Sequence, residues 1–248
     1  MQNKKTSRLK NIVEITGPTG VGKSTIMNEL QKIRKEDDSW IYAPDLIKKY
    51  RGPGLNPRTW KMAAGRRFHK ENPEFWKEFH SHHKTFIEKD SWYIKRKRAF
   101  EFYQMYAEFQ AVHELYQKDK VPKWPVCVIE ESMIYRSFTR LEMDINSSSL
   151  IKFAESFPLP GNLICLDAPA DVIAGRAYSR KKTPPIHRGL NKDEIEDAAR
   201  IHKNRFDKLL LFLDHLGVKT HRVSVVGAPV DSAQKIHELL KKIADDIS

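Results

Sequence analysis

Residues 11–25, NIVEITGPTGVGKST, join a short apolar run to a glycine-rich turn and the start of a helical pattern. The turn and its flank, Gly17-Pro18-Thr19-Gly20-Val21-Gly22-Lys23-Ser24-Thr25, contain the pattern GxxxxGK[ST]. Glycines let successive backbone N–H groups point inward at an anion, and a helix start adds the positive end of its dipole. Lys23 is expected to reach nucleotide β- and γ-phosphates, and the Ser24 hydroxyl to bind Mg²⁺. The stretch therefore predicts a phosphate-binding loop.

Short apolar runs alternate with longer helical patterns along the rest of the chain, which is typical of an α/β protein. Further strands are predicted over residues 40–43, 126–130, 163–167 and 221–226. Long helices are predicted over residues 96–118 and 191–216; the second begins with Asn191 and Glu194 in capping-box spacing and stops at Gly217. We therefore expect a three-layer P-loop α/β fold in which helices flank a five-stranded parallel sheet.

The length of 248 residues fits a single domain over residues 1–248. Residues 51–92 show no pattern as regular as the rest, although short helices are expected around residues 74–79. About residues 46–95 are therefore interpreted as a helical insertion on the acceptor side of the site.

Positive charge is concentrated in that insertion. The net charge is +12, and residues 51–100 hold 13 Lys and Arg against five acids, so +8 of the excess lies in one fifth of the chain. Such a surface favours an anionic partner. Aromatic residues alternate with these cations, so the insertion could stack a base or sugar while Arg58, Arg66 or Arg67 binds a phosphate.

The two cysteines, Cys127 and Cys165, each lie inside an apolar run that reads as a buried strand. This pattern excludes a disulfide framework and argues against catalytic thiol chemistry. No run approaches the ~18 apolar residues of a membrane helix, and the N-terminus lacks the apolar segment of a signal peptide. The sequence predicts a cytoplasmic protein without membrane insertion, and leaves a homodimer open.

The run over residues 126–130, VCVIE, supplies the acid that a phosphate-binding loop needs at the end of a second strand. Glu130 is the candidate for holding Mg²⁺ together with Ser24. Glu131 follows directly, and because adjacent residues diverge near a strand end, only one of the two acids is expected to face the metal. The other is either a base or merely exposed.

Several segments together resemble the P-loop nucleoside and nucleoside monophosphate kinases, in particular the deoxynucleoside kinase and thymidylate kinase branch. The resemblance spans roughly residues 10–230 and rests on GPTGVGKST at 17–25, FEFYQMYAEFQ at 100–110, IEES at 129–132 and LDAPADVIAGRAYSR at 166–180. It implies a kinase that uses ATP and Mg²⁺.

The resemblance also implies roles for residues outside the phosphate-binding loop. Asp45, in the altered order Ala-Pro-Asp, would approach the acceptor hydroxyl. About residues 170–190 would form a mobile lid, and Gly227 and Ala228 would border the adenine. Because Arg176 and Arg180 are spaced i, i+4, they would project from one helix face and, with Arg188, stabilise the transferring phosphoryl group. Arg136 is a further candidate for an acceptor-side cation.

These residues predict an ATP- and Mg²⁺-dependent phosphotransferase that acts on a nucleoside, a nucleotide or a related small hydroxyl-bearing metabolite, most simply an anionic one. Asp45 or Glu131 would orient the acceptor hydroxyl. Two alternatives stay open. The +8 charge over residues 51–100 could instead follow a nucleic-acid backbone in a polynucleotide 5′-hydroxyl kinase. The Glu130-Glu131 pair could activate water in a nucleotide-operated NTPase switch.

Overall fold

The computed structural model describes residues 8–36, 38–50, 56–75, 77–78, 106–117, 123–138, 148–179 and 189–247. The strands are β1 (Arg8–Thr16), β2 (Trp40–Tyr42), β3 (Val126–Glu130), β4 (Leu159–Asp167) and β5 (Lys219–Ser224). The helices are α1 (Lys23–Ile33), α2 (Ala43–Tyr50), α3 (Pro57–Glu71), α6 (Met133–Phe138), α7 (Ser148–Glu155), α8 (Ala170–Tyr178), α9 (Lys192–His215) and α10 (Pro229–Asp245). Residues 106–117 are helical as well.

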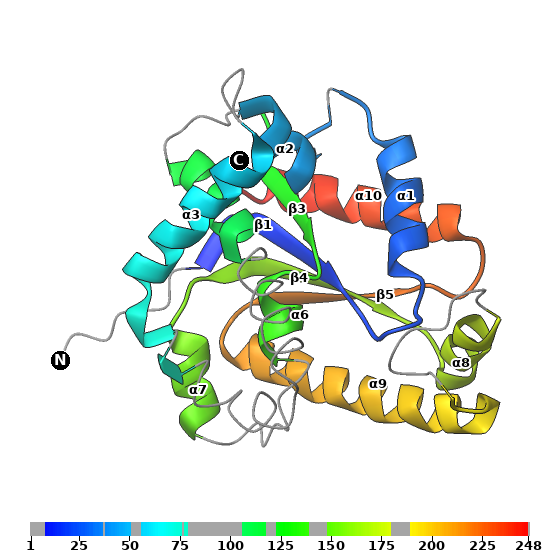
Figure 1. Cartoon of the computed structure of the whole chain (residues 1–248). Coiled ribbons are helices and arrows are strands. Elements are labelled where there is room, and N and C mark those ends of the chain that lie inside the picture. The colour runs from blue at the N-terminus through cyan, green and yellow to red at the C-terminus, as the bar shows by residue number, and fades with distance from the viewer. Residues whose placement is uncertain are drawn as a thin grey trace.

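The five strands form one parallel sheet in the order β2-β3-β1-β4-β5. Helices α1 and α10 lie on one side of this sheet and α9 on the other (Figure 1). β1 is the central strand, so the loop that follows it opens in the middle of the carboxyl edge. The predicted three-layer P-loop α/β fold is confirmed.

Alternate residues of the central strands enter two separate cores, as expected for strands covered on both faces. Ile12 and Cys127 pack with α6, α7 and α9, whereas Val13, Ile15 and Val128 pack with α1 and α10. Both cysteines are buried and free, as predicted. Burial raises the pKa of each thiol, which keeps the thiols neutral and unreactive.

The bounds of four strands differ from their predictions. Strand β1 begins at Arg8, three residues before the predicted start at Asn11. Strand β2 ends at Tyr42, and α2 begins at Ala43 with Pro44 in its first turn, where a proline is tolerated because the first N–H groups have no helical partner. Strand β4 begins at Leu159 rather than at residue 163. Gly161 allows this extension, since a Cβ there would lie 2.8 Å from the Cα of Lys10. Strand β5 is shifted two residues towards the N-terminus.

The charged insertion contains a helix that the sequence pattern does not reveal. Helix α3 occupies 15 residues of the stretch interpreted as a helical insertion. It is anchored by Ala64 and Phe68, both fully buried, and Phe68 stacks on Tyr106 with a centroid distance of 5.3 Å. The sequence pattern predicts short helices only around residues 74–79 and misses α3, because the apolar face of this helix is narrow and lies between basic residues.

The predicted helices agree with the structure elsewhere. The predicted helix 191–216 is α9, and Asn191 and Glu194 form the capping box in both directions. Of the predicted helix 96–118, residues 106–117 are described and helical. Among the described residues, none of the helices combines the length and apolar character that crossing a bilayer requires.

Candidate active site

The carboxyl ends of all five parallel strands lie at one edge of the sheet, where α/β proteins bind their ligands. The phosphate-binding loop follows β1, Glu130 ends β3, α8 follows β4 and residues 225–228 follow β5. The fold thus brings together segments that are up to about two hundred residues apart in the sequence.

Two glycines of the phosphate-binding loop are required by close neighbours. A Cβ at Gly17 would lie 2.6 Å from the carbonyl oxygen of Leu166 in β4. Gly20 has a φ of +97°, which favours glycine, and a Cβ there would lie 3.0 Å from a methyl group of Ile173 in α8. The loop is therefore held against both β4 and α8.

Lys23 begins α1, and its ammonium group is held within the loop. The Nζ atom donates to the carbonyl oxygens of Gly17 at 2.7 Å and Pro18 at 3.0 Å, and lies 2.9 Å from Oε1 of Glu131. An ammonium group has three N–H donors, so these three partners use all of them. The carboxylate of Glu131 therefore occupies the position beside Lys23 where an anionic ligand would be expected.

The two consecutive acids at the end of β3 have different partners. Oε2 of Glu130 accepts a hydrogen bond of 3.4 Å from the hydroxyl of Tyr42, whereas Glu131 pairs with Lys23. Glu131 has a φ of +45°, and its N–H donates to the carbonyl oxygen of Ile15. This left-handed backbone turns the second carboxylate away from the first and towards the loop.

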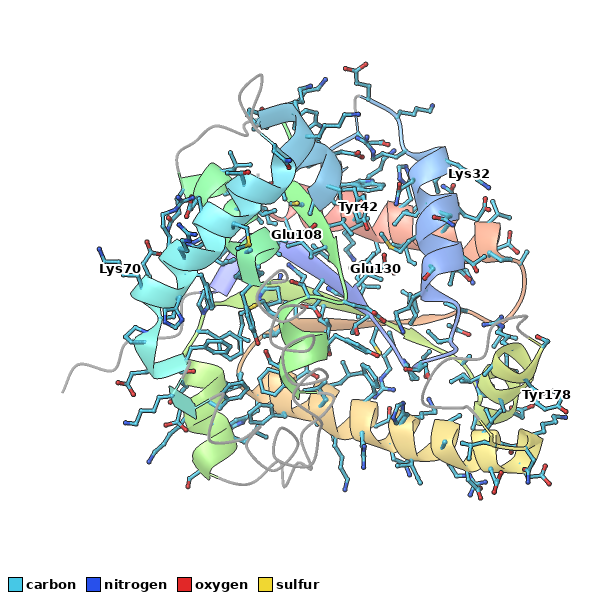
Figure 2. The ribbon with its side chains drawn as sticks, viewed as in Figure 1. Lys32, Tyr42, Lys70, Glu108, Glu130 and Tyr178 are labelled. Atoms are coloured by element: carbon cyan, nitrogen blue, oxygen red, sulfur yellow. The ribbon has the colours of Figure 1, made fainter. Side chains whose placement is uncertain are left out.

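Glu130 has the features of a carboxylate that assists a metal ion. Tyr42 and Glu130 lie close together at the end of β3 (Figure 2). Burial, and then repulsion by Glu131, raise the pKa of Glu130. A divalent cation nearby would offset both effects by favouring the charged form.

Mg²⁺ fits the donors that the site offers. In nucleotide enzymes it takes few protein ligands and completes its shell with waters and phosphate oxygens. Among the described residues, no group of three or more His, Cys, Asp and Glu side chains could hold a metal ion by itself. Glu130 and the exposed Ser24 hydroxyl at the start of α1 are suited to this sparse coordination.

Glu14 is a functional candidate that the sequence analysis does not identify. It lies in β1, is only 1% exposed, and accepts backbone N–H groups of Ile134 at 2.9 Å and Tyr135 at 2.8 Å. Burial raises its pKa to about 7 despite these hydrogen bonds, and the charge of Glu131 adds to the increase. An acid in the middle of an apolar strand, NIVEIT, is the sequence signal that points to it.

Tyr135 is the second such candidate. Its backbone is held by Glu14, its ring lies 5.4 Å from Nζ of Lys23, and its hydroxyl lies 3.4 Å from Oγ1 of Thr19. The ring also stacks on Phe206 of α9. Tyr135 therefore connects the phosphate-binding loop to the opposite layer of the fold. No sequence motif marks it.

The three predicted lid arginines are only partly described. Arg176 lies in α8 and donates to the carbonyl oxygens of Val21 and Val225, each at 2.7 Å. Arg180, Arg188 and the residues between them lie outside the described residues, whereas α8 forms the first part of the predicted lid. The placement of Arg176 differs from the expected one, because its guanidinium group binds protein backbone.

The predicted acceptor-side residues are distributed over three helices. Asp45 is in the first turn of α2, 3.4 Å from the guanidinium group of Arg34. Arg67 in α3 makes two hydrogen bonds of 2.5 and 2.6 Å to Glu114. Arg66, also in α3, is exposed. Arg58 and Arg136 lie in α3 and α6, and their side chains are outside the described part.

The loop predicted to border the adenine connects β5 to α10. Its backbone is tied to β4, since the N–H of Val225 donates to the carbonyl oxygen of Asp167 at 2.9 Å. Gly227 has a φ of +108°, and Ala228 caps α10 before Pro229. Val226 is 57% exposed. The loop thus presents open, partly apolar surface beside the site.

No protein-family model matches this chain, and no curated protein sequence matches it. A solved structure of shikimate kinase from Bacteroides thetaiotaomicron is similar over 93% of this chain and 98% of that chain, with 16% sequence identity and a TM-score of 0.41. The fold assignment rests on the sheet order and on the loop that follows β1. The deoxynucleoside kinase and thymidylate kinase branch remains a prediction.

Proposed function

We propose that this protein is an ATP- and Mg²⁺-dependent phosphotransferase that acts on a small hydroxyl-bearing acceptor. One observation carries the proposal: Lys23 is fixed in a glycine-rich loop at the centre of the carboxyl edge, with the carboxylate of Glu131 on its ammonium group and Glu130 alongside. This set provides a cation for phosphate oxygens and a carboxylate for the metal shell, which are the parts that phosphoryl transfer requires.

The residues have distinct roles in this proposal. The loop backbone and Lys23 bind the phosphates of ATP, and Ser24 and Glu130 assist Mg²⁺, which neutralises developing charge when bound. Asp45 or Glu131 orients the acceptor hydroxyl. Arg180 and Arg188 remain the candidates for stabilising the transferring group.

The acceptor is a nucleoside, a nucleotide or a related metabolite. The positive charge of residues 51–100 supports an acceptor that is already anionic. In the described part of that region, however, Arg67 is paired with Glu114. Binding of an acceptor phosphate is therefore assigned to Arg58, Arg66 or Arg136 ahead of Arg67.

The nucleotide site is tested by titrating the protein with ATP and Mg²⁺ in an isothermal calorimeter. Lys23→Ala is expected to abolish detectable binding with the fold intact, as judged by circular dichroism. Lys32→Ala is the matched control, because Lys32 lies on the same helix but is 69% exposed and pairs with Glu29 one turn away. Binding that survives Lys23→Ala, or falls equally in the control, would refute the site.

A polynucleotide acceptor is the second candidate, supported by the +8 charge of residues 51–100. Binding to a 5′-hydroxyl oligonucleotide would then weaken steeply with salt. Weak binding that does not depend on salt would eliminate this candidate. ATP hydrolysis that needs no acceptor would instead favour the NTPase switch.

A further inference from the structure

Arg176 connects two loops that are about two hundred residues apart in the sequence. One nitrogen of its guanidinium group, Nη1, donates to the carbonyl oxygen of Val21 in the phosphate-binding loop at 2.7 Å. The other, Nη2, donates to the carbonyl oxygen of Val225, just after β5, at the same distance. Both acceptors are backbone atoms, so these contacts fix the positions of the loops themselves.

The packing of α8 strengthens this connection. Gly20 of the phosphate-binding loop leaves room for Ile173 and Ala177, which flank Arg176 on the same helix. At Gly22 a Cβ would lie 3.6 Å from Nη1 of Arg176. The helix therefore lies directly against the loop, and its arginine reaches past the loop to residues 225–228.

The second loop is anchored on its other side. Its Val225 is 1% exposed and donates to Asp167 at the end of β4. The residues that follow are open within the described part of the chain: Val226 is 57% exposed, and a Cβ at Gly227 would meet no described atom within 4 Å. Arg176 thus holds the rigid base of a loop whose exposed part is available to a ligand.

We propose that Arg176 is a positioning residue that fixes the phosphate-binding loop relative to residues 225–228, and so couples binding of the triphosphate to binding of the base. This inference rests on the proposed function, because it takes both loops as parts of one ATP site. A planar guanidinium group can bind two carbonyl oxygens at once, whereas an ammonium group or an amide cannot span them in the same way.

The test compares ATP with inorganic tripolyphosphate, which has the phosphates but no base. Arg176→Lys and Arg176→Gln are each titrated with both ligands. Arg200→Gln serves as control, because Arg200 is exposed on α9 and pairs with Asp197 of the same helix. Both Arg176 variants are expected to lose about tenfold or more in ATP affinity, the effect of removing a charged hydrogen bond. Their affinity for tripolyphosphate should fall less than their affinity for ATP, because tripolyphosphate uses only one of the two loops that lose their common anchor.

The outcomes separate this inference from the proposed function. Equal losses for ATP and tripolyphosphate, or no loss for either, would overturn the coupling role while leaving the nucleotide site in place. A fall in kcat with unchanged ATP affinity would assign Arg176 to the transition state instead. A wild-type protein that binds neither ligand would overturn both proposals.

A measurement without any ligand tests the same contact. Amide hydrogen exchange of the free protein should become faster in Arg176→Gln at residues 17–22 and also at residues 225–228, because both loops lose the same anchor. The Arg200→Gln control should leave both segments unchanged. Faster exchange in only one of the two loops would contradict the proposed connection.

Discussion

Replacing Glu131 by Gln should tighten the binding of ATP. Among the described residues, Glu131 forms the ion pair with Lys23, and the other two ammonium protons are donated to the carbonyl oxygens of Gly17 and Pro18. A phosphate oxygen that binds Lys23 must therefore displace one of these three acceptors. Displacing the carboxylate requires the smallest structural change, because the two carbonyl groups belong to the backbone of the loop that binds the phosphates. A glutamine side chain has nearly the same size as a glutamate side chain and suits the same φ of +45° at residue 131, so the variant removes only the charge.

The expected gain in ATP affinity can be worked out from the solvent exposure of the Lys23–Glu131 ion pair. The side chains of Lys23 and Glu131 are 9% and 24% exposed. Fully exposed pairs contribute about 0–1 kcal/mol. Two charges 4 Å apart near a protein surface attract by about 4 kcal/mol before desolvation is subtracted. A competing interaction of about 1–2 kcal/mol lies between these limits, and at about 1.4 kcal/mol per tenfold it predicts ATP binding about five- to thirtyfold tighter.

Calorimetric titration with ATP, with and without Mg²⁺, measures this change. Glu29→Gln is the control, because it removes a carboxylate from another ion pair on α1, with Lys32, outside the loop. Unchanged or weaker ATP affinity in Glu131→Gln would show that Glu131 does not compete with phosphate for Lys23. Glu131 would then be a supporting residue of the loop.

Two further predictions concern residues that support the site. Glu14 has a pKa raised to about 7 from 4.5, so the folded protein binds the extra proton and stability is lost as pH rises through this window. The stability of Glu14→Gln relative to wild type should therefore rise between about pH 4.5 and pH 7, by at most about 3 kcal/mol in urea denaturation, and level off at higher pH; a difference that stays constant with pH would contradict this. Arg67→Lys should lower the free energy of unfolding by about 1 kcal/mol without changing the acceptor KM, because its two hydrogen bonds go to Glu114. An increase in KM at unchanged stability would place Arg67 in the acceptor site.

The parts of the fold that the sequence predicts well are those whose signals are local. Strand β3 has the predicted bounds, because an apolar run is closed by Glu130 on one side and preceded by prolines on the other. Helix α9 is marked by its capping box and by Gly217, which has a φ of +73°. The phosphate-binding loop is likewise predicted from a local signal, since its motif determines the backbone conformation within eight consecutive residues.

The features that the sequence does not predict depend on contacts between distant segments. Strand β4 extends through Gly161, outside the predicted range 163–167, where it passes close to Lys10. Arg67 finds its partner, Glu114, 47 positions away on another helix. Arg176 carries the positive charge expected of a residue that binds phosphate. Only the folded chain shows that its guanidinium group donates hydrogen bonds to two carbonyl oxygens. Side-chain roles at the site therefore depend on packing that no local pattern encodes.

Phosphoryl transfer from ATP tests the central claim most directly. Wild type and Lys23→Ala are incubated with Mg²⁺, γ-labelled ATP and, separately, nucleosides, nucleotides, sugar alcohols and 5′-hydroxyl oligonucleotides, and labelled products are separated and identified by mass. The proposed function predicts that wild type labels a small hydroxyl-bearing acceptor and that Lys23→Ala does not. Release of labelled phosphate with no labelled acceptor in any reaction, or equal labelling by the two proteins, would contradict it.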